Sequence, residues 1–308
     1  MYSRVADRFR LITSPAVFFV FILFCGMLAV YFSNAYPAIR REGVHLFLDN
    51  TWRAAEEPEE EYYGIAAAIW GSIYTSSIAI LISMPLAISY SIFVVDYAPK
   101  RVKNVLIITS DVMAGLPTII YGIWGVFVLV PFMKRYVMTP LYKHLHFIPL
   151  FSTPPISGFS YLSAGVLLAI MVTPFSSAII REAYQMVPFR YREGAYALGL
   201  TRYEATKVLL GYIKPAIYSG LVLAFGRAIG ETVAVSLVIG NSFNLTPSIF
   251  SPGYTISSLI ANQFGNSFIY GHMRPVLYAA GLVLFLIGFL VNLAGMFILR
   301  RWKKNVEI

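Results

Sequence analysis

Two opposite charges lie four residues apart in the apolar stretch FGRAIGETVAV, residues 225 to 235. On a continuous helix, Arg227 and Glu231 would share one face and could reach each other. A guanidinium can bind an oxyanion through paired hydrogen bonds, so the spacing indicates either a structural ion pair or a site that briefly holds an anion. We favour the anion site, because an apolar pair of similar volume would pack without the cost of desolvating two charges.

The composition of the chain is that of an integral membrane protein. Of its 308 residues, 58% are hydrophobic and 13% are charged, and the mean hydropathy is +0.68, outside the range of soluble domains. About 20 apolar residues cross a hydrocarbon core, and the alternation expected of a membrane barrel is absent from these runs. We predict an all-α fold with six spanning helices, the first of them retained rather than cleaved as a signal peptide. The predicted spans are residues 15–33, 66–95, 105–131, 157–180, 215–240 and 275–299.

Basic residues divide unequally between the two sides of these spans. Sixteen Lys and Arg residues lie on one side and seven on the other, and Arg227 alone lies within a span. The positive-inside rule therefore predicts a multi-pass protein of the cell membrane with both termini in the cytoplasm. The net charge of +9 is explained by anionic lipid headgroups, and we predict no nucleic-acid partner.

The three predicted outer loops differ in charge. Residues 34–64 carry seven carboxylates, including the run EEPEEEYY at 56–63, whereas residues 132–160 and 241–273 carry none. An approaching anion would be repelled by the first loop and tolerated by the others. The acidic run is equally typical of a solvated outer face, and both interpretations stay open.

Helix breakers and one further carboxylate lie in or beside the predicted spans. Pro85, Gly115, Pro117 and Pro174 indicate either pore-lining and hinge positions or close packing through small residues. Asp111, near the start of the third predicted span, is either an N-terminal cap or a second charge on the pathway.

Neither histidines nor cysteine indicate a bound metal. His144 and His146 share a loop without a third ligand, and we predict neither a metal site nor a cofactor. Cys25 is the only cysteine, so a disulfide within the chain is excluded, and we expect it to pack as a small apolar residue in the first span.

The most specific signal is the loop between the fourth and fifth predicted spans, residues 181–220. Its mixed charge and helix-forming residues predict one or two short helices at the membrane surface that present Glu193, Ala195 and Gly199 to a partner outside the bilayer. The stretch REGAYALG within it resembles the EAA loop of ABC importer permeases, which docks into the ATPase subunit.

The resemblance carries over residue by residue. Glu193, Gly194 and Ala195 match the glutamate and two small residues that open the EAA motif, and Gly199 has the spacing of its glycine. Gly194 replaces the usual alanine, and Tyr212 stands where a proline is usual. The resemblance implies that Glu193, Gly194, Ala195 and Gly199 form the ATPase-coupling loop, with the end of its second helix left open.

Two further motifs extend the resemblance over roughly residues 65–300. GRAIGETVAV, the stretch AGLPTIIYGIWGVFVLVP at 114–131 and the long first outer loop are together similar to permeases of the PstC type from phosphate ABC importers. PstA-type permeases share GRAIGET-like residues, and the long outer loop favours the PstC type. The resemblance implies a type I ABC importer permease fold with a helix and acidic loop at 1–64, a permease domain at 65–300 and a cytoplasmic tail at 301–308.

The same resemblance implies a set of partners. An extracellular phosphate-binding protein would deliver the ion, a second homologous permease of the PstA type would complete the pathway, and a dimer of cytoplasmic ATP-binding subunits would drive transport. In agreement, the sequence lacks the phosphate loop G-x-x-x-x-G-K-[ST], so we expect no catalytic activity in this chain.

Arg227 and Glu231 are then the predicted substrate-pathway residues. A permease for another oxyanion, such as sulfate or molybdate, stays an alternative. A secondary transporter or membrane enzyme would need several titratable groups in the spans, and Glu231 is the only carboxylate well within a predicted one.

Overall fold

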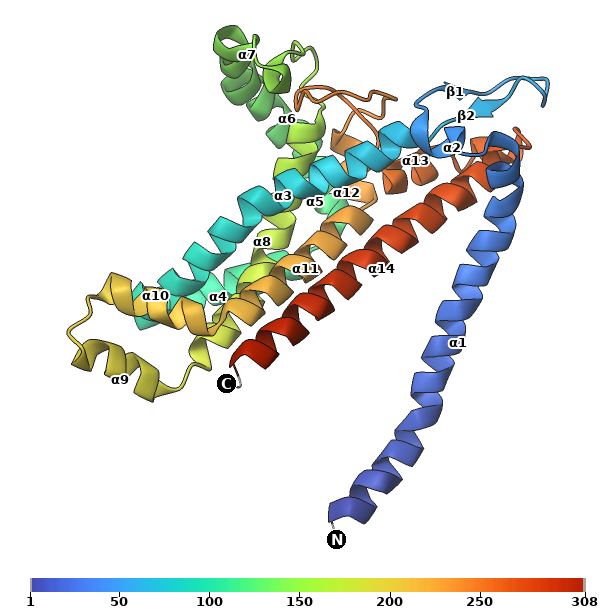
Figure 1. The fold of residues 1–308 in the computed structure, drawn as a ribbon. Coiled ribbons are helices and arrows are strands. Elements are labelled where there is room, and N and C mark those ends of the chain that lie inside the picture. The colour runs from blue at the N-terminus through green and yellow to red at the C-terminus, as the bar shows by residue number, and fades with distance from the viewer. Residues whose placement is uncertain (1, 307–308) are drawn as a thin grey trace.

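The computed structural model describes residues 2–306, most of which lie in helices (Figure 1). The longest helices are α1 (Tyr2–Glu42), α3 (Ala66–Ile92), α8 (Tyr161–Gln185), α11 (Lys214–Gly230) and α14 (Met273–Val306). The shorter helices are α2 (His45–Leu48), α4 (Lys100–Gly115), α5 (Thr118–Trp124), α6 (Val130–Phe132), α7 (Thr139–Leu145), α9 (Phe189–Ala197), α10 (Arg202–Tyr212), α12 (Val233–Val238) and α13 (Ile256–Gln263). Segments of π-helix are η1 (Phe93–Tyr97), η2 (Gly125–Leu129) and η3 (Met133–Met138), and 3-10 turns are η4 (Pro149–Phe151) and η5 (Asn266–Phe268).

The acidic outer loop contains the one small sheet of the described residues. Strands β1 (Trp52–Arg53) and β2 (Tyr62–Tyr63) pair antiparallel, with Trp52 opposite Tyr63. The hairpin between them carries the exposed acidic run, and Arg41 donates hydrogen bonds to backbone carbonyls of that run, among them Pro58 (2.8 Å). The run is thus held against the end of α1 with most of its carboxylates facing solvent.

Five helices within the described residues are long and apolar enough to cross a membrane, and a sixth is counted when α10 and α11, bent by 67°, are taken together. The five are Thr13–Glu42, Ala66–Tyr97, Thr118–Leu145, Tyr161–Gln185 and Met273–Phe297. The predicted all-α, multi-pass fold is confirmed. Because α10 is polar and α11 is apolar, the membrane-crossing part of the bent pair is α11.

The third predicted span, 105–131, is wrong. The chain breaks at Leu116 and Pro117, where the backbone is extended, and the span begins at Thr118 and continues to Leu145. Proline disfavours a helical conformation in the residue before it, which separates the charged helix α4 from the span. The second outer loop therefore begins after Leu145 rather than at residue 132.

The core of the bundle is the contact between α3 and α8. Both helices present small residues to each other, including Ser76, Ala79, Ala164 and Ser176, all fully buried. A Cβ atom on Gly165 would lie 2.5 Å from Cγ2 of Ile78, so the helices approach as closely as small residues permit. Close packing therefore accounts for many of the small residues in these spans.

The prolines do not act alike. Pro85 and Pro174 lie inside continuous helices, whereas Pro117 stands at the break between α4 and α5.

Asp111 lies well inside α4, near its C-terminal end, so the N-terminal cap that we considered for it is wrong.

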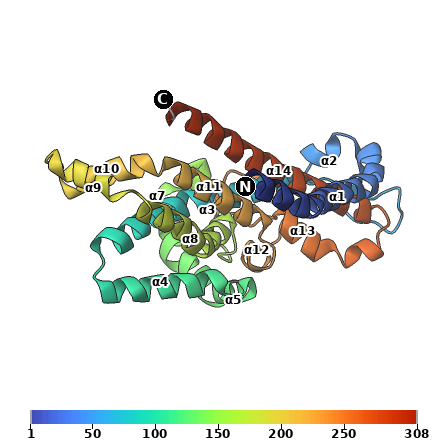
Figure 2. The same cartoon turned by 90° about the horizontal axis from the view of Figure 1, so that it is seen from below.

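The ends of the bundle differ. Helices α9 and α10 lie at the same end as the described chain ends, and α7 and the β-hairpin lie at the opposite end (Figure 1). Figure 2 shows α4 and α5 along one side of the bundle and α14 along the other.

Helix α1 meets α14 through Phe24 and Phe285, whose ring centroids are 5.0 Å apart, and its N-terminal part diverges from the bundle. Cys25 is in this first span, as predicted, but it is exposed rather than packed.

Candidate substrate pathway and coupling loop

The stretch that contains Arg227 and Glu231 is not one continuous helix. Helix α11 ends at Gly230, Glu231 is extended (φ −70°, ψ 125°), and α12 begins at Val233. Arg227 lies in the last turn of α11, where a cation is favoured by the helix dipole. The expectation that both charges share one helical face is therefore wrong.

Arg227 is exposed. Its guanidinium carbon lies 5.7 Å from the ring centroid of Phe175 in α8. None of the ion pairs among the described residues involves Arg227 or Glu231. The structural ion pair considered from the sequence is therefore wrong, and no carboxylate among the described residues neutralises the charge of Arg227.

Glu231 is half-buried and holds the break in place. Its Oε1 accepts a hydrogen bond from the backbone N–H of Ala234 in the first turn of α12 (3.4 Å). Its carbonyl oxygen accepts one from the Ser257 hydroxyl of α13 (2.9 Å). Non-helical backbone at membrane depth is tolerated where neighbouring groups satisfy it, and α13 does so here.

The two motifs of the spans pack directly against each other. Gly122 and Gly125 of the stretch 114–131 face α12: a Cβ on Gly122 would lie 3.1 Å from Cα of Ala234, and one on Gly125 would lie 2.8 Å from Cγ1 of Val238. Only glycine allows so close an approach. The sequence AGLPTIIYGIWG thus positions the helix that follows Glu231.

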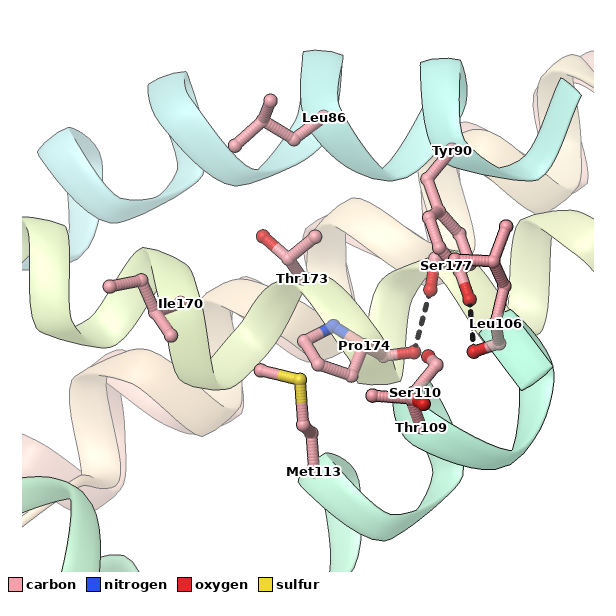
Figure 3. A pocket seen from close by; sticks show the side chains of 10 residues that line it. All are labelled: Leu86, Tyr90, Leu106, Thr109, Ser110, Met113, Ile170, Thr173, Pro174 and Ser177. Carbon is pink, nitrogen blue, oxygen red and sulfur yellow. Dashed lines mark hydrogen bonds between the residues drawn. The ribbon is translucent and has the colours of Figure 1, made fainter. Parts of the chain in front are cut away.

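A cavity of about 290 Å³ lies between α3, α4 and α8 (Figure 3). Its lining residues are Leu86, Tyr90, Leu106, Thr109, Ser110, Met113, Ile170, Thr173, Pro174 and Ser177. None is charged, and the hydroxyls of Tyr90 and Ser177 donate to backbone carbonyls of Leu106 and Pro174. The cavity lacks a cation and is therefore a poor site for an oxyanion.

Asp111 pairs with a buried arginine. Its Oδ1 lies 3.5 Å from Nη2 of Arg181 in α8, with the Asp111 side chain 56% exposed and the Arg181 side chain 8% exposed. The pair links α4 to α8. Sequence reasoning counted Arg181 among the surface residues of the loop and missed that it is buried in a span.

The predicted coupling loop forms a helical hairpin of α9 and α10 at the end of the molecule away from the β-hairpin. Gly199 follows α9 with φ +77°, a conformation that favours glycine, and the backbone N–H of Leu200 donates back to the Ala195 carbonyl (3.2 Å). Thr201 and Glu204 then form a capping box that begins α10. The spacing of the motif thus encodes a tight turn between two short helices.

The exposure of the four coupling-loop residues is not uniform. Glu193, Gly194 and Gly199 are exposed, as expected of residues that meet a partner. Ala195 is 5% exposed, so the expectation that it is presented outward is wrong. Because Ala195 faces the chain itself, it lets the hairpin close rather than offering contact area to a partner.

Sequence reasoning also missed a polar cluster beneath this hairpin, formed by Asp96, Tyr184 and Arg192. Asp96 is 88 residues from Tyr184 and 96 from Arg192 in the chain, and the only local signal is a carboxylate at the end of the apolar run of residues 66–95.

The sequence of this chain matches a known protein family. The sequence model of the family described as "Binding-protein-dependent transport system inner membrane component" matches residues 91–304. Among curated relatives, the "Probable phosphate transport system permease protein PstC" of Methanocaldococcus jannaschii is 66% identical, over 99% of this chain and 96% of the relative. The "Phosphate transport system permease protein PstC" of Xylella fastidiosa (strain Temecula1) is 39% identical, over 98% of this chain and 93% of the relative.

A solved structure shares the fold. A chain of the MetNI methionine ABC transporter, in an inward-facing conformation, superposes with a TM-score of 0.54 at 16% identity, over 77% of this chain and 94% of that chain. The likeness shows the permease fold of type I ABC importers. Because the family model matches most of the chain and full-length relatives are highly identical, the chain belongs to the family of binding-protein-dependent transport system inner membrane components, in its PstC group.

Proposed function

We propose that the chain is the transmembrane permease subunit of an ATP-driven phosphate importer, forms half of the translocation pathway and couples to a separate ATPase subunit. The observation that carries the proposal is Arg227, an exposed guanidinium with no carboxylate partner among the described residues, at a break in a spanning helix. Relatives named as phosphate permeases, identical at 66% and 39% of positions, support phosphate as the ion.

In this proposal the two charges have different tasks on the pathway. Arg227 attracts the anion and offers its planar donors to the oxygens of phosphate. Glu231 accepts a hydrogen bond from the protonated oxygen that phosphate carries near neutral pH. Sulfate is fully ionised and has no proton to donate, so the carboxylate repels it. The negative charge of Glu231 therefore favours phosphate over sulfate, because phosphate can donate a hydrogen bond to it and sulfate cannot.

The helical hairpin of α9 and α10 is the proposed docking element for a dimer of cytoplasmic ATP-binding subunits. Glu193, Gly194 and Gly199 are exposed there, and Ala195 closes the hairpin behind them. The chain contains no phosphate loop of its own, which supports ATP hydrolysis in a separate subunit. The first and last described residues lie at the same end as this hairpin (Figure 1), which supports cytoplasmic termini.

We also infer the remaining division of the chain and its partners. Residues 1–64 form an anchor helix with an acidic external loop, residues 65–300 form the permease domain, and residues 301–308 form the tail. A second permease of the PstA type faces the pathway side, and an extracellular phosphate-binding protein delivers the ion on the side of the β-hairpin.

The test is transport by the assembled complex. The chain is reconstituted in liposomes with its second permease and ATPase, and uptake of labelled phosphate is measured with ATP inside and phosphate-loaded binding protein outside. We expect uptake that needs both ATP and the binding protein and that a tenfold excess of sulfate or molybdate leaves unchanged. Preferential uptake of sulfate or molybdate contradicts the substrate, and uptake by this chain alone without ATP contradicts the importer.

A further inference from the structure

We propose that Asp96, Tyr184 and Arg192 form a latch that transmits movement of the ATPase-facing hairpin to two membrane-spanning helices. The proposal rests on the proposed function, because it concerns how a separate ATPase would move this chain. Asp96 and Arg192 are positioning residues in this view: neither contacts the transported ion, and both act through the elements that they join.

The geometry of the latch centres on one carboxylate. Asp96 lies in η1, the π-helical turn that ends the span Ala66–Tyr97. Its Oδ2 accepts a hydrogen bond from the Tyr184 hydroxyl of α8 (2.6 Å). Its Oδ1 pairs with Nη1 of Arg192 in α9, and the Arg192 guanidinium carbon lies 5.5 Å from the Tyr184 ring centroid. Each carboxylate oxygen thus binds a different helix.

The latch is largely shielded from water. The side chains of Asp96 and Arg192 are 15% and 27% exposed, and Tyr184 is 1% exposed. Burial is the largest single influence on the pKa of Arg192 and lowers it, but the hydrogen bond to Asp96, the charge of Asp96 and the nearby Tyr184 and Tyr196 together raise that pKa above its ordinary value. Removing one partner of such a pair leaves the other charge poorly solvated, so the contact is more rigid than an exposed ion pair.

The latch is also the direct ionic link between the hairpin and the bundle. Among the side chains that the structure describes, those of residues 13–297, Arg192–Asp96 is the only ion pair that joins α9 to a membrane-spanning segment. Arg190, on the same helix, is exposed and lies over the ring of its neighbour Tyr191. Helix α9 otherwise packs mainly on α10, so few other contacts can carry its movement.

The position of the latch fits transmission. Arg192 is followed directly by Glu193, which is exposed and belongs to the proposed docking surface. Tyr184 packs in a buried apolar cluster with residues of α3 and α10, including Met84, Ala87 and Leu209. A push on α9 therefore reaches the ends of α3 and α8 through adjacent residues, at the point where these two helices and the hairpin meet.

The test separates coupling from folding. In the reconstituted complex, Asp96→Asn and Arg192→Gln are each expected to lower ATP-driven uptake about tenfold and to raise the ATP hydrolysed per ion transported. The control Arg101→Gln, at an exposed cation of α4 outside the hairpin, is expected to stay within about twofold of the wild type. The double variant is expected to be no worse than either single variant, because both remove one interaction.

A covalent link provides the rescue. In a Cys25→Ser background, Asp96→Cys with Arg192→Cys, joined by a short bifunctional thiol reagent, is expected to restore coupled uptake that is lost before cross-linking. Normal coupling in the single variants, additive losses in the double variant, or a cross-link that blocks uptake would each overturn the latch. Absence of uptake by the wild-type complex contradicts the importer itself, so the two failures are distinguishable.

Discussion

At the scale of single residues, the energetics of Arg227 favour a role in transport. A cation within a spanning helix costs about 2.5–3.5 kcal/mol on insertion scales. The cation–π contact with the Phe175 ring, 5.7 Å away, offsets about 0.5–2 kcal/mol of this cost. No ion pair among the described residues offsets the remainder. A residue with this net cost is retained for what it binds rather than for stability.

Arg227→Lys tests the planar donor. We expect uptake below half of the wild type, because lysine keeps the charge but loses the paired geometry that matches an oxyanion. Initial uptake rates in the reconstituted complex give the measurement, with Arg101→Lys at an exposed position of α4 as the control. Near-normal uptake by Arg227→Lys would show that a point charge suffices there.

Glu231→Gln tests selection by charge. Glutamine still offers an oxygen to the N–H of Ala234, so the break that Glu231 now holds should persist. We expect lower phosphate uptake and stronger inhibition by sulfate, because the repelling charge is gone. Competition curves give the measurement, and Glu59→Gln in the exposed outer loop is the control. Unchanged uptake together with unchanged discrimination would refute the role of the carboxylate.

At the scale of elements, the contact between α5 and α12 decides where the charges lie. The glycines of α5 and η2 bring the backbone of α12 close, and the Ser257 hydroxyl of α13 satisfies the carbonyl of Glu231 at the break (2.9 Å). The charges that we propose for the pathway are therefore supported from both sides, by a close helix contact and by a hydrogen bond to the unwound backbone. A change at either support should move them.

Gly122→Ala should disrupt this arrangement. The added Cβ would lie 2.6 Å from Cδ1 of Leu237 and 3.1 Å from Cα of Ala234, and overpacking costs about 1–3 kcal/mol. We expect a lower apparent melting temperature in detergent and reduced uptake. Gly115→Ala is the matched control, because no atom lies within 4 Å of its added Cβ. Equal melting temperatures for the two variants would mean that α12 shifts freely.

At the scale of the whole molecule, the distribution of charge matches the arrangement of the ends. The hairpin of α9 and α10 carries Arg190, Arg192, Arg202 and Lys207, whereas the acidic run at 56–61 lies at the opposite end beside the β-hairpin. The proposed orientation, with the basic end at the cytoplasmic leaflet, places these residues beside anionic lipid headgroups, which attract them. Under the proposed function, a phosphate ion enters at the end that carries the acidic run, past the uncharged outer loops, and leaves toward the basic end.

The single native cysteine makes this orientation testable. In a Cys25→Ser background, a membrane-impermeant maleimide added to intact cells is expected to label His144→Cys, in α7, and not Arg202→Cys, in α10, because both positions are exposed but lie at opposite ends. Permeabilised cells provide the control, in which both variants should react. Labelling of Arg202→Cys alone in intact cells would reverse the orientation.

Much of the fold was predictable because it depends on apolar length. The spans that contain α3, α8 and α14 could be predicted from continuous apolar runs alone, because a helix that crosses a bilayer needs about 20 apolar residues. The hairpin turn was equally local, since Gly199 with Thr201 and Glu204 encodes it within six residues. The prolines were not predictable in this way: Pro117 ends a helix and Pro174 does not, although both lie in apolar surroundings.

The sequence by itself determined that this chain crosses a membrane repeatedly, that one loop turns tightly at a surface, and that Arg227 and Glu231 lie four residues apart in an apolar stretch. All three depend on neighbours within a few residues. Only the tertiary structure decided that these two charges do not pair, because the end of α11 is set by contacts with α13, 26 residues away. It likewise brought Asp96 to Tyr184 and Arg192, 88 and 96 residues away, since contacts between distant segments form only when the helices pack.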